Sequence, residues 1–307
     1  FTFDRSLNKA FHEYLQEGKN ELLRLPYERY MNRQFYLCLF RVISILGERS
    51  TFLTAWTYAK LLLSINPTQD PLGVRYFIDF YAIMSEQYEW LIKFGESPFV
   101  LTYEWWFTPG IAFSLVLAYL RIGNEEKAKV AMKQAFNSHR HLAFRLLEQI
   151  GLSSEMPKHE KAANELELLG AETYLIIAAI LWKDQKERTF LHDELVTLFR
   201  ENAKPKPSFF QSVFGDNTEH VENMPHNLLR FAILSGENKL MAKIPEVVWS
   251  RSDVLEYVVL PPQDETSEYS QFTGIGGQSQ VVDGLLNYVD QKLLGAIIQN
   301  QSGDDVL

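Results

Sequence analysis

The chain has 307 residues, of which 46 % are hydrophobic and 13 % aromatic. This much apolar material can form one large domain or two smaller ones, and it excludes intrinsic disorder for the bulk of the chain. Thirty basic residues against 39 acidic ones give a net charge of −9, which argues against binding along a nucleic-acid backbone. A single cysteine, Cys38, excludes an internal disulfide and suits a reducing compartment. Because the chain begins with Phe1 rather than Met, we expect it to be part of a longer protein.

The sequence contains no stretch that predicts a membrane span. The most apolar window covers residues 168–182, and Gly170, Glu172 and Thr173 interrupt it. About 20 continuous apolar residues are needed to cross a bilayer. We therefore expect a buried helix in this window and no membrane partner.

Helical spacing of apolar residues is common in the first 140 residues, whereas the alternation typical of β-strands is scarce. The helix predicted over residues 51–65 ends before Asn66–Pro67. The next one begins after Asp70 with Pro71 in its first turn, where the missing N–H of proline costs nothing. The helices predicted in this part cover residues 35–46, 51–65, a segment from 71 onward, 87–94, 109–122 and 125–136.

These helices form pairs that recur along the chain. Successive pairs begin near Tyr36, Pro71 and Pro109, at spacings of 35 and 38 residues. A period near 34 residues with a helix–turn–helix in each unit is typical of tetratricopeptide (TPR) repeats. The third pair keeps Ala128 at a position where such repeats favour a small residue. We therefore predict an all-α fold, a TPR-like α-solenoid of degenerate helix–turn–helix repeats.

Beyond Arg140 the period is lost, although helical segments continue. Helices are predicted over residues 141–150, 160–182, 187–201, 225–234 and 238–243. We therefore predict four segments. Residues 1–201 form a TPR-like helical repeat domain, and residues 202–262 form a loop-rich connection with short helices packing on the body. Residues 263–280 form a flexible linker, and residues 281–299 form a C-terminal amphipathic helix.

The C-terminal helix is predicted to be strongly amphipathic. One stripe contains the apolar residues, and the polar residues Asp283, Asn287, Asp290 and Gln291 face away from it. Such a helix either docks on the body of the protein or binds a groove in a partner, and we favour docking on the body. The residues of the stripe are Val282, Leu286, Val289, Leu293 and Ile297.

No residue set predicts an active site, a metal site or a cofactor site. His139 and His141 are two residues apart and so lie on different faces of a helix, whereas a metal pair needs a spacing of three or four. We expect solvated or capping histidines. Cys38 lies in an apolar helix and is expected to be a buried, inert thiol. The glycines of residues 274–277 follow a polar linker rather than a strand, so we interpret them as a flexible joint.

Asp79 is unusual because it lies between Ile78 and Phe80 in a mostly apolar helix. We expect a buried carboxylate paired with an arginine such as Arg33 or Arg41, which would make it structural. A functional role is the second interpretation.

Aromatic residues are concentrated in the connection between two predicted helix pairs, at Tyr103, Trp105, Trp106 and Phe107. Loops often carry binding residues, and Trp and Tyr dominate interface hot spots. The other interpretation, which we favour, is that both tryptophans fill the gap between the pairs.

Residues 58–91 resemble a known family, which contains ribosome quality control complex subunit one and its animal relative, transcription factor twenty-five. The resemblance covers most of the chain. Its motifs are Leu61–Pro67, Asp70-Pro71-Leu72-Gly73, Ile78–Ala82 and Gln87-Tyr88-Glu89-Trp90-Leu91, with flanking matches at residues 1–6, 32–37, 109–114, 181–183, 225–234 and 260–262.

The resemblance implies a non-enzymatic adaptor that handles stalled nascent chains. The implied partners are a Listerin-type RING E3 ligase, ubiquitin, an AAA+ segregase and the 60S ribosomal subunit carrying the stalled chain. The implied outcome is proteasome-directing ubiquitin chains of one linkage, and the implied location is the cytoplasm, with a nuclear pool left open. Residues assigned to partner contact are Tyr103, Trp105, Trp106, Asp79, Tyr88 and Glu89.

Two other functions compete with this one. A generic TPR-like peptide-binding module, for a chaperone or another partner, needs a basic clamp, and the lysines and asparagines that would build one are sparse. An enzyme would need a perturbed carboxylate or histidine in a deep pocket. Direct DNA binding is not expected, because the sequence has neither a basic recognition helix nor a zinc-ligand pattern.

Overall fold

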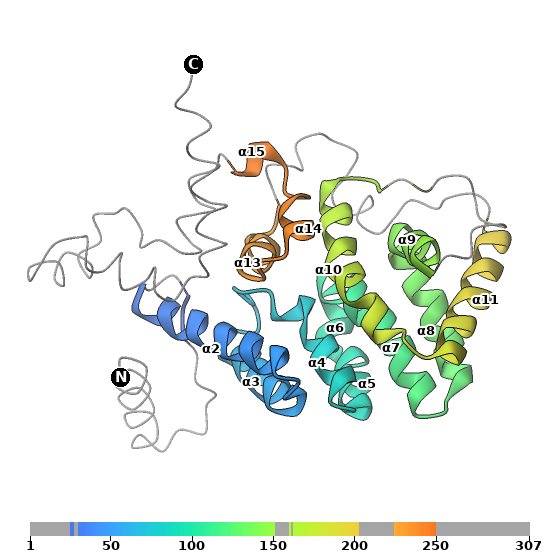
Figure 1. Ribbon diagram of the computed structural model, residues 1–307, viewed down its shortest axis with the longest axis horizontal. Coiled ribbons are helices and arrows are strands. Elements are labelled where there is room, and N and C mark those ends of the chain that lie inside the picture. Colours follow the sequence, from blue (N-terminus) through green and yellow to red (C-terminus); the bar gives the residue numbers. More distant parts are fainter. Residues whose placement is uncertain (1–24, 28–29, 151–159, 161, 203–223, 250–307) are drawn as a thin grey trace, which may run out of the picture.

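A computed structural model of the chain describes residues 25–27, 30–150, 160, 162–202 and 224–249 (Figure 1). Every regular element within these residues is a helix, which confirms the all-α class. None of the helices in this part of the chain is long and apolar enough to cross a membrane. The linker predicted over 263–280, the glycines of 274–277 and the C-terminal helix predicted over 281–299 lie outside the described residues.

The first two helices among the described residues, α2 (Tyr30–Glu48) and α3 (Phe52–Ile65), pack side by side at one end of the row of helices (Figure 1). Ser50 turns the chain between them with a φ of 57°. Ala55 and Ala59 of α3 are completely buried, and their small side chains let the two helices approach closely. The pair confirms the first two predicted helices, and α2 begins five residues before the predicted start.

The helix predicted from Pro71 onward is wrong at its start. Residues 71–73 form a turn, followed by the 3₁₀ turn η1 (Val74–Tyr76) and the short helix α4 (Ile78–Met84). Gly73 has a φ of 68°, and a Cβ there would lie 2.6 Å from the Asn227 carbonyl oxygen. Only glycine fits this turn without strain, and a left-handed residue cannot continue a helix.

Next come α5 (Tyr88–Gly95) and two elements that the sequence did not predict, α6 (Pro98–Thr102) and η2 (Glu104–Trp106). The pair α7 (Pro109–Arg121) and α8 (Glu125–Ser138) confirms the predicted one. Thr108 caps α7 by accepting a hydrogen bond from the Ile111 N–H at 3.3 Å. Residues 109–119 of α7 are all buried, because α4, α5, α8 and α10 surround this helix.

The remaining helices are α9 (Arg140–Ile150), α10 (Glu165–Leu181), α11 (Gln185–Glu201), α13 (His226–Leu234), α14 (Asn238–Met241) and α15 (Glu246–Trp249). Two of them return to distant parts of the sequence: α10 packs against α7 and α4, and α13 packs against η1. Asn164 starts α10 by accepting the Glu167 N–H at 2.9 Å. The helix therefore begins five residues later than predicted.

The contact between α4 and α7 depends on Gly110. A Cβ at this position would lie 2.9 Å from Asp79 Oδ2 and 3.2 Å from Oδ1. The absence of a side chain therefore lets the carboxylate lie against the first turn of α7, whose unpaired N–H groups favour a negative charge.

We expect Gly110→Ala to lower the free energy of unfolding by about 1–3 kcal/mol, because the new methyl group overlaps a buried carboxylate. Gly170→Ala is the matched control, since the nearest atom to a Cβ there is Pro109 Cγ at 3.8 Å. That variant should stabilise α10 by about 0.5–1 kcal/mol through a lower unfolded-state entropy. Chemical denaturation measures both, and equal shifts of the two variants would contradict the close approach.

Candidate functional site

The aromatic segment between α5 and α7 is divided into a buried part and an exposed part. Trp106 exposes 1 % of its surface, whereas Trp105 exposes 55 % and Tyr103 exposes 41 %. The prediction that both tryptophans fill the gap is therefore right for Trp106 and wrong for Trp105. The 3₁₀ turn η2 causes the difference, because two neighbouring side chains in a tight turn point in different directions.

Trp106 is fixed by a buried arginine. The Cζ atom of Arg75 lies 4.0 Å from the Trp106 ring centroid, a cation–π geometry. The rings of Phe94 and Phe99 pack on the same indole at centroid distances of 6.1 and 4.7 Å. The Arg75 Nη1 group also donates to the Trp105 carbonyl oxygen at 3.5 Å. Arg75 therefore holds both the ring of one tryptophan and the backbone of the other.

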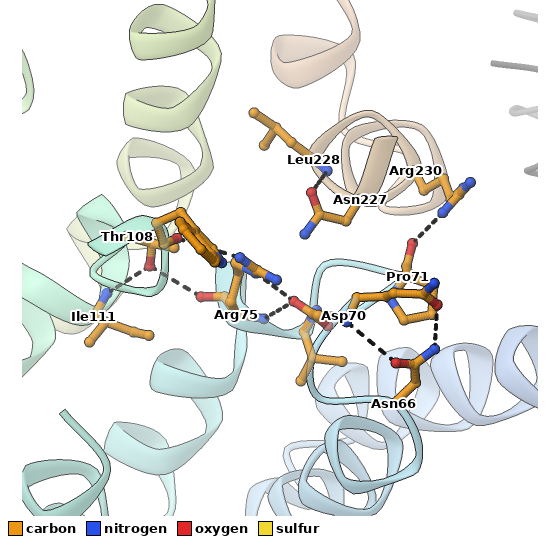
Figure 2. Close-up of polar contacts among 12 residues, drawn as sticks. Asn66, Asp70, Pro71, Arg75, Thr108, Ile111, Asn227, Leu228 and Arg230 are labelled. Atoms are coloured by element: carbon orange, nitrogen blue, oxygen red, sulfur yellow. Dashed lines mark hydrogen bonds and ion pairs between the residues drawn. The ribbon is translucent and has the colours of Figure 1, made fainter. Parts of the chain in front are cut away.

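Asp70 is the partner of Arg75 and organises the turn before η1 (Figure 2). Its Oδ2 accepts a hydrogen bond from Arg75 Nε at 2.8 Å, and the two side chains are 0 % and 5 % exposed. The same carboxylate accepts the backbone N–H groups of Val74 at 2.7 Å and Arg75 at 3.1 Å. A buried ion pair is stabilising only when its remaining hydrogen-bonding capacity is satisfied, and here the backbone supplies those bonds.

Two further bonds join this ion pair to the helices around it (Figure 2). Thr108 Oγ1 donates to the Arg75 carbonyl oxygen at 3.2 Å, and the same residue caps α7. On the other side, Arg230 Nη1 of α13 donates to the Pro71 carbonyl oxygen at 3.1 Å. The Phe231 ring of α13 stacks on Tyr76 and Phe77 at centroid distances of 5.9 and 5.6 Å. The turn thus links α3, α4, α7 and α13.

The exposed part of the segment forms a small surface, which we call the outer aromatic patch. It consists of Leu101, Tyr103 and Trp105, whose exposed fractions are 60 %, 41 % and 55 %. The rings of Tyr103 and Trp105 lie 5.0 Å apart, and Tyr103 packs on Phe99 at 5.7 Å. Exposed aromatic side chains supported from below are typical of interface hot spots. The patch is therefore the most suitable partner surface on this segment.

Asp79 is buried, as predicted, but its partner is not an arginine. Ser114 Oγ of α7 donates to Asp79 Oδ2 at 2.7 Å, and Oδ1 has no hydrogen-bond partner within the described residues. Burial raises the pKa of Asp79 to about 6, and the Ser114 bond opposes this shift. Pairing with Arg33 or Arg41 was therefore the wrong prediction.

The same geometry corrects two of the residues assigned to partner contact. Asp79 is 0 % exposed and Trp106 is 1 % exposed, and a side chain without accessible surface cannot contact a partner. Tyr88 is half-buried, with the Arg121 guanidinium carbon 5.8 Å from its ring centroid. Glu89 is exposed in the first turn of α5, where a carboxylate is favourable for the helix. These two residues are thus associated with α5 and α7 rather than with the outer aromatic patch.

Of the predicted solvated or capping histidines, His139 is the C-cap residue of α8. His139 and His141 are 3 % and 6 % exposed, so neither is solvated. His139 Nε2 lies 2.7 Å from the Phe107 carbonyl oxygen, and burial lowers the pKa of His139 to about 4, which keeps the ring neutral. Cys38 is half-buried rather than buried, and burial raises the pKa of its thiol. Within the described residues no group of three His, Cys, Asp or Glu side chains could hold a metal ion.

The sequence did not reveal Asp70 and Arg75 as an organising pair. The motif Asp70-Pro71-Leu72-Gly73 carried the resemblance, but nothing in it assigned a role to Arg75, five residues after Asp70. Leu101 of the outer aromatic patch was also missed, because an isolated leucine gives no sign of its exposure.

The family model described as transcriptional repressor TCF25 matches residues 1–262. The chain belongs to this family. It is 32 % identical over its whole length to ribosome quality control complex subunit 1 of Saccharomyces cerevisiae. It is 27 % identical over 86 % of its length to ribosome quality control complex subunit TCF25 of Homo sapiens, and 26 % identical over 95 % to ribosome quality control complex subunit 1 of Schizosaccharomyces pombe.

The resemblance drawn from the sequence is thus confirmed. The chain spans 41–42 % of the length of these relatives. No solved structure matches it.

In this TCF25-family chain we expect Trp106→Ala to lower the free energy of unfolding by about 3–5 kcal/mol, since it leaves a cavity beside a buried arginine. Trp105→Ala, one residue earlier, should cost less than about 1 kcal/mol because its ring is exposed. Urea denaturation followed by circular dichroism checks the pair. Similar losses of unfolding free energy in both variants would contradict the burial of Trp106 and the exposure of Trp105.

Asp79 should give the protein a characteristic pH dependence. Its folded-state pKa of about 6 lies above the ordinary value of 3.8, so the folded chain binds more protons than the unfolded one between these values. The free energy of unfolding should therefore fall as the pH rises from 4 to 6, by up to about 3 kcal/mol from this residue. Asp79→Asn should flatten that slope, measured by denaturation at each pH. Parallel curves for the two proteins would refute the raised pKa.

Proposed function

We propose that this chain is part of a non-enzymatic adaptor in ribosome-associated quality control. The observation that carries the proposal is the 32 % identity over the whole chain to ribosome quality control complex subunit 1 of S. cerevisiae. The relatives in H. sapiens and Schiz. pombe have names of the same complex.

We further propose that the adaptor acts with a Listerin-type RING ligase and ubiquitin on a stalled chain held by the 60S subunit, before an AAA+ segregase extracts it. The physical contribution would be positioning. Holding an acceptor ubiquitin in one orientation presents one of its lysines to the thioester of the incoming ubiquitin. The effective concentration of that lysine rises, which favours one chain linkage. We propose that the adaptor acts in the cytoplasm, and the proposal also allows a nuclear pool of the protein.

The helix pairs are proposed to form a TPR-like solenoid within the predicted repeat domain of residues 1–201. The order of contacts supports this arrangement, because α2, α3, α4, α5, α7 and α8 each pack on the next helix in the chain. The short helices α13 and α14, within the predicted connection of residues 202–262, contact η1 and α10.

The position of α10 weighs against the alternative of a generic peptide-binding module. This helix packs on α4 and α7, the first helices of two successive pairs, and Tyr174 of α10 is completely buried. The Phe113 and Tyr174 rings lie 6.1 Å apart, and Trp182 Nε1 donates to the Tyr174 hydroxyl at 2.9 Å. A peptide would have to displace this packed helix in order to reach α4 and α7.

The outer aromatic patch is the proposed contact with the ligase or ubiquitin. Trp105 and Tyr103 present exposed rings, and the Arg75–Trp106 contact fixes the backbone beneath them. Such pre-organisation reduces the entropy lost on binding.

A linkage-resolved ubiquitylation assay with the ligase, with and without the intact adaptor, tests the proposal. We expect the adaptor to raise the proportion of one proteasome-directing linkage, and Trp105→Ala with Tyr103→Ala to reduce this effect at least about tenfold, as for loss of a hot spot worth 1.4 kcal/mol or more. Val130→Ala, at a 69 % exposed position of α8, is the matched control.

Two results would decide against parts of the proposal. An unchanged linkage composition on adding the adaptor would remove the positioning role and leave recruitment. Equal activity of the patch variant and the Val130→Ala control would move the partner contact away from the outer aromatic patch.

A further inference from the structure

The exposed residues on the outer face of helix α3 are all uncharged, and Lys60 beside them is partly buried. The exposed fractions of Leu53, Tyr58 and Leu61 are 56 %, 36 % and 38 %. The face also contains hydroxyl groups, but Thr57 donates to the Leu53 carbonyl oxygen at 2.9 Å and Ser64 to that of Leu61 at 2.7 Å, which lowers their need for water. A helix at a protein surface normally carries charges opposite its buried side. We call this surface the α3 face, and it contains all exposed residues of α3, namely Leu53, Thr54, Thr57, Tyr58, Leu61 and Ser64.

The α2–α3 pair also differs from the rest of the chain in its charge. Residues 30–66 contain one acidic residue and four basic ones, of which Arg33 is buried, in a chain whose net charge is −9. The neighbouring helix α2 adds exposed apolar side chains at Val42 and Ile45, with exposed fractions of 36 % and 39 %. The pair lies at one end of the row of helices (Figure 1). This end therefore suits an occupant that is apolar on one side and acidic elsewhere.

The C-terminal part of the same chain has this chemistry. Residues 250–307 contain nine acidic residues and two basic ones. The stripe predicted over residues 282–297 extends about 22 Å as a helix, and the 14 residues of α3 extend about 21 Å. Residue 281 lies 32 positions after Trp249, the end of α15, and a random coil of about that length spans about 30 Å on average. Length, apolar pattern and charge thus all match.

We propose that the apolar stripe of residues 281–298 docks on the α3 face of its own chain. Leu286, Val289 and Leu293 contact Leu61, Tyr58 and Leu53, and the net negative charge of residues 250–307 is attracted by the net positive charge of residues 30–66. Because the connection keeps the segment at an effective concentration of about 1 mM, even a weak intrinsic affinity suffices for docking. This inference does not depend on the proposed function.

Crosslinking of the full chain tests the docking, because each side offers one lysine. Lys60 is the only lysine of residues 30–66, and Lys292 is the only lysine of residues 250–307. Lys60 Nζ lies 3.4 Å from the Trp56 ring centroid, and burial lowers the pKa of this amine, which favours its reaction. We expect an amine-reactive reagent to join Lys60 to Lys292, with a yield that does not change with protein concentration.

Two pairs of variants make the test specific. Leu286→Asp with Leu293→Asp should reduce the Lys60–Lys292 product at least tenfold, whereas Asn287→Asp with Gln291→Asp adds the same charge to the opposite side and should retain it. Leu61→Asp should also remove the product, and Val130→Asp on α8 should retain it. Circular dichroism checks that every variant is folded.

Several outcomes would overturn the inference. Lys292 products with other lysines but not with Lys60 would place the segment elsewhere. A yield that rises with concentration, and products that join isotopically distinct copies, would assign the α3 face to a second chain. Retention of the product in folded Leu61→Asp would show that the α3 face does not hold the segment.

Discussion

A buried ion pair organises the centre of this protein. Asp70 and Arg75 as whole residues expose 1 % and 4 % of their surface. Removing two charges from water costs several kcal/mol for each ion unless other groups compensate. The compensation here comes from two backbone N–H groups on the carboxylate and an indole face on the guanidinium. The two N–H groups belong to η1, whereas the indole belongs to η2. The pair therefore fixes their relative positions.

The consequences extend to every helix around the turn. The Arg75 carbonyl oxygen holds Thr108, which caps α7, and the Arg75 guanidinium holds the backbone before Trp106. The Pro71 carbonyl oxygen holds Arg230 of α13. A segment more than 150 residues away in sequence is thus attached to the same turn that positions the aromatic segment. The exposed rings of Tyr103 and Trp105 stand on this rigid support, which is a sound physical basis for an interaction surface.

A second buried polar contact lies between α4 and α7. Asp79 is bonded to Ser114 and has no cationic partner in the part of the chain that the structure describes. Its raised pKa reflects the cost of burying this carboxylate. Gly110 provides the space for it at the first turn of α7. Next to this contact, α10 covers α4 and α7 through Tyr174 and Phe113. Helix α10 therefore occupies the faces of α4 and α7 that a bound peptide would need.

The sequence by itself determined the helical class and most helix positions, because apolar periodicity and boundary residues such as Pro67 and Pro109 act within a few residues. The motifs of residues 58–91 identified the family. The sequence also identified Asp79 as a buried carboxylate from its apolar neighbours. Only the tertiary structure decided that Ser114 bonds to Asp79, that Trp106 is buried beside an exposed Trp105, and that α10 returns to α4. These features depend on contacts between residues that are far apart in the chain, and no local pattern encodes them. The turn at Gly73 shows the same limit: its φ of 68° interrupts the predicted helix, and a Cβ there would meet Asn227 and Phe231 of the distant helix α13.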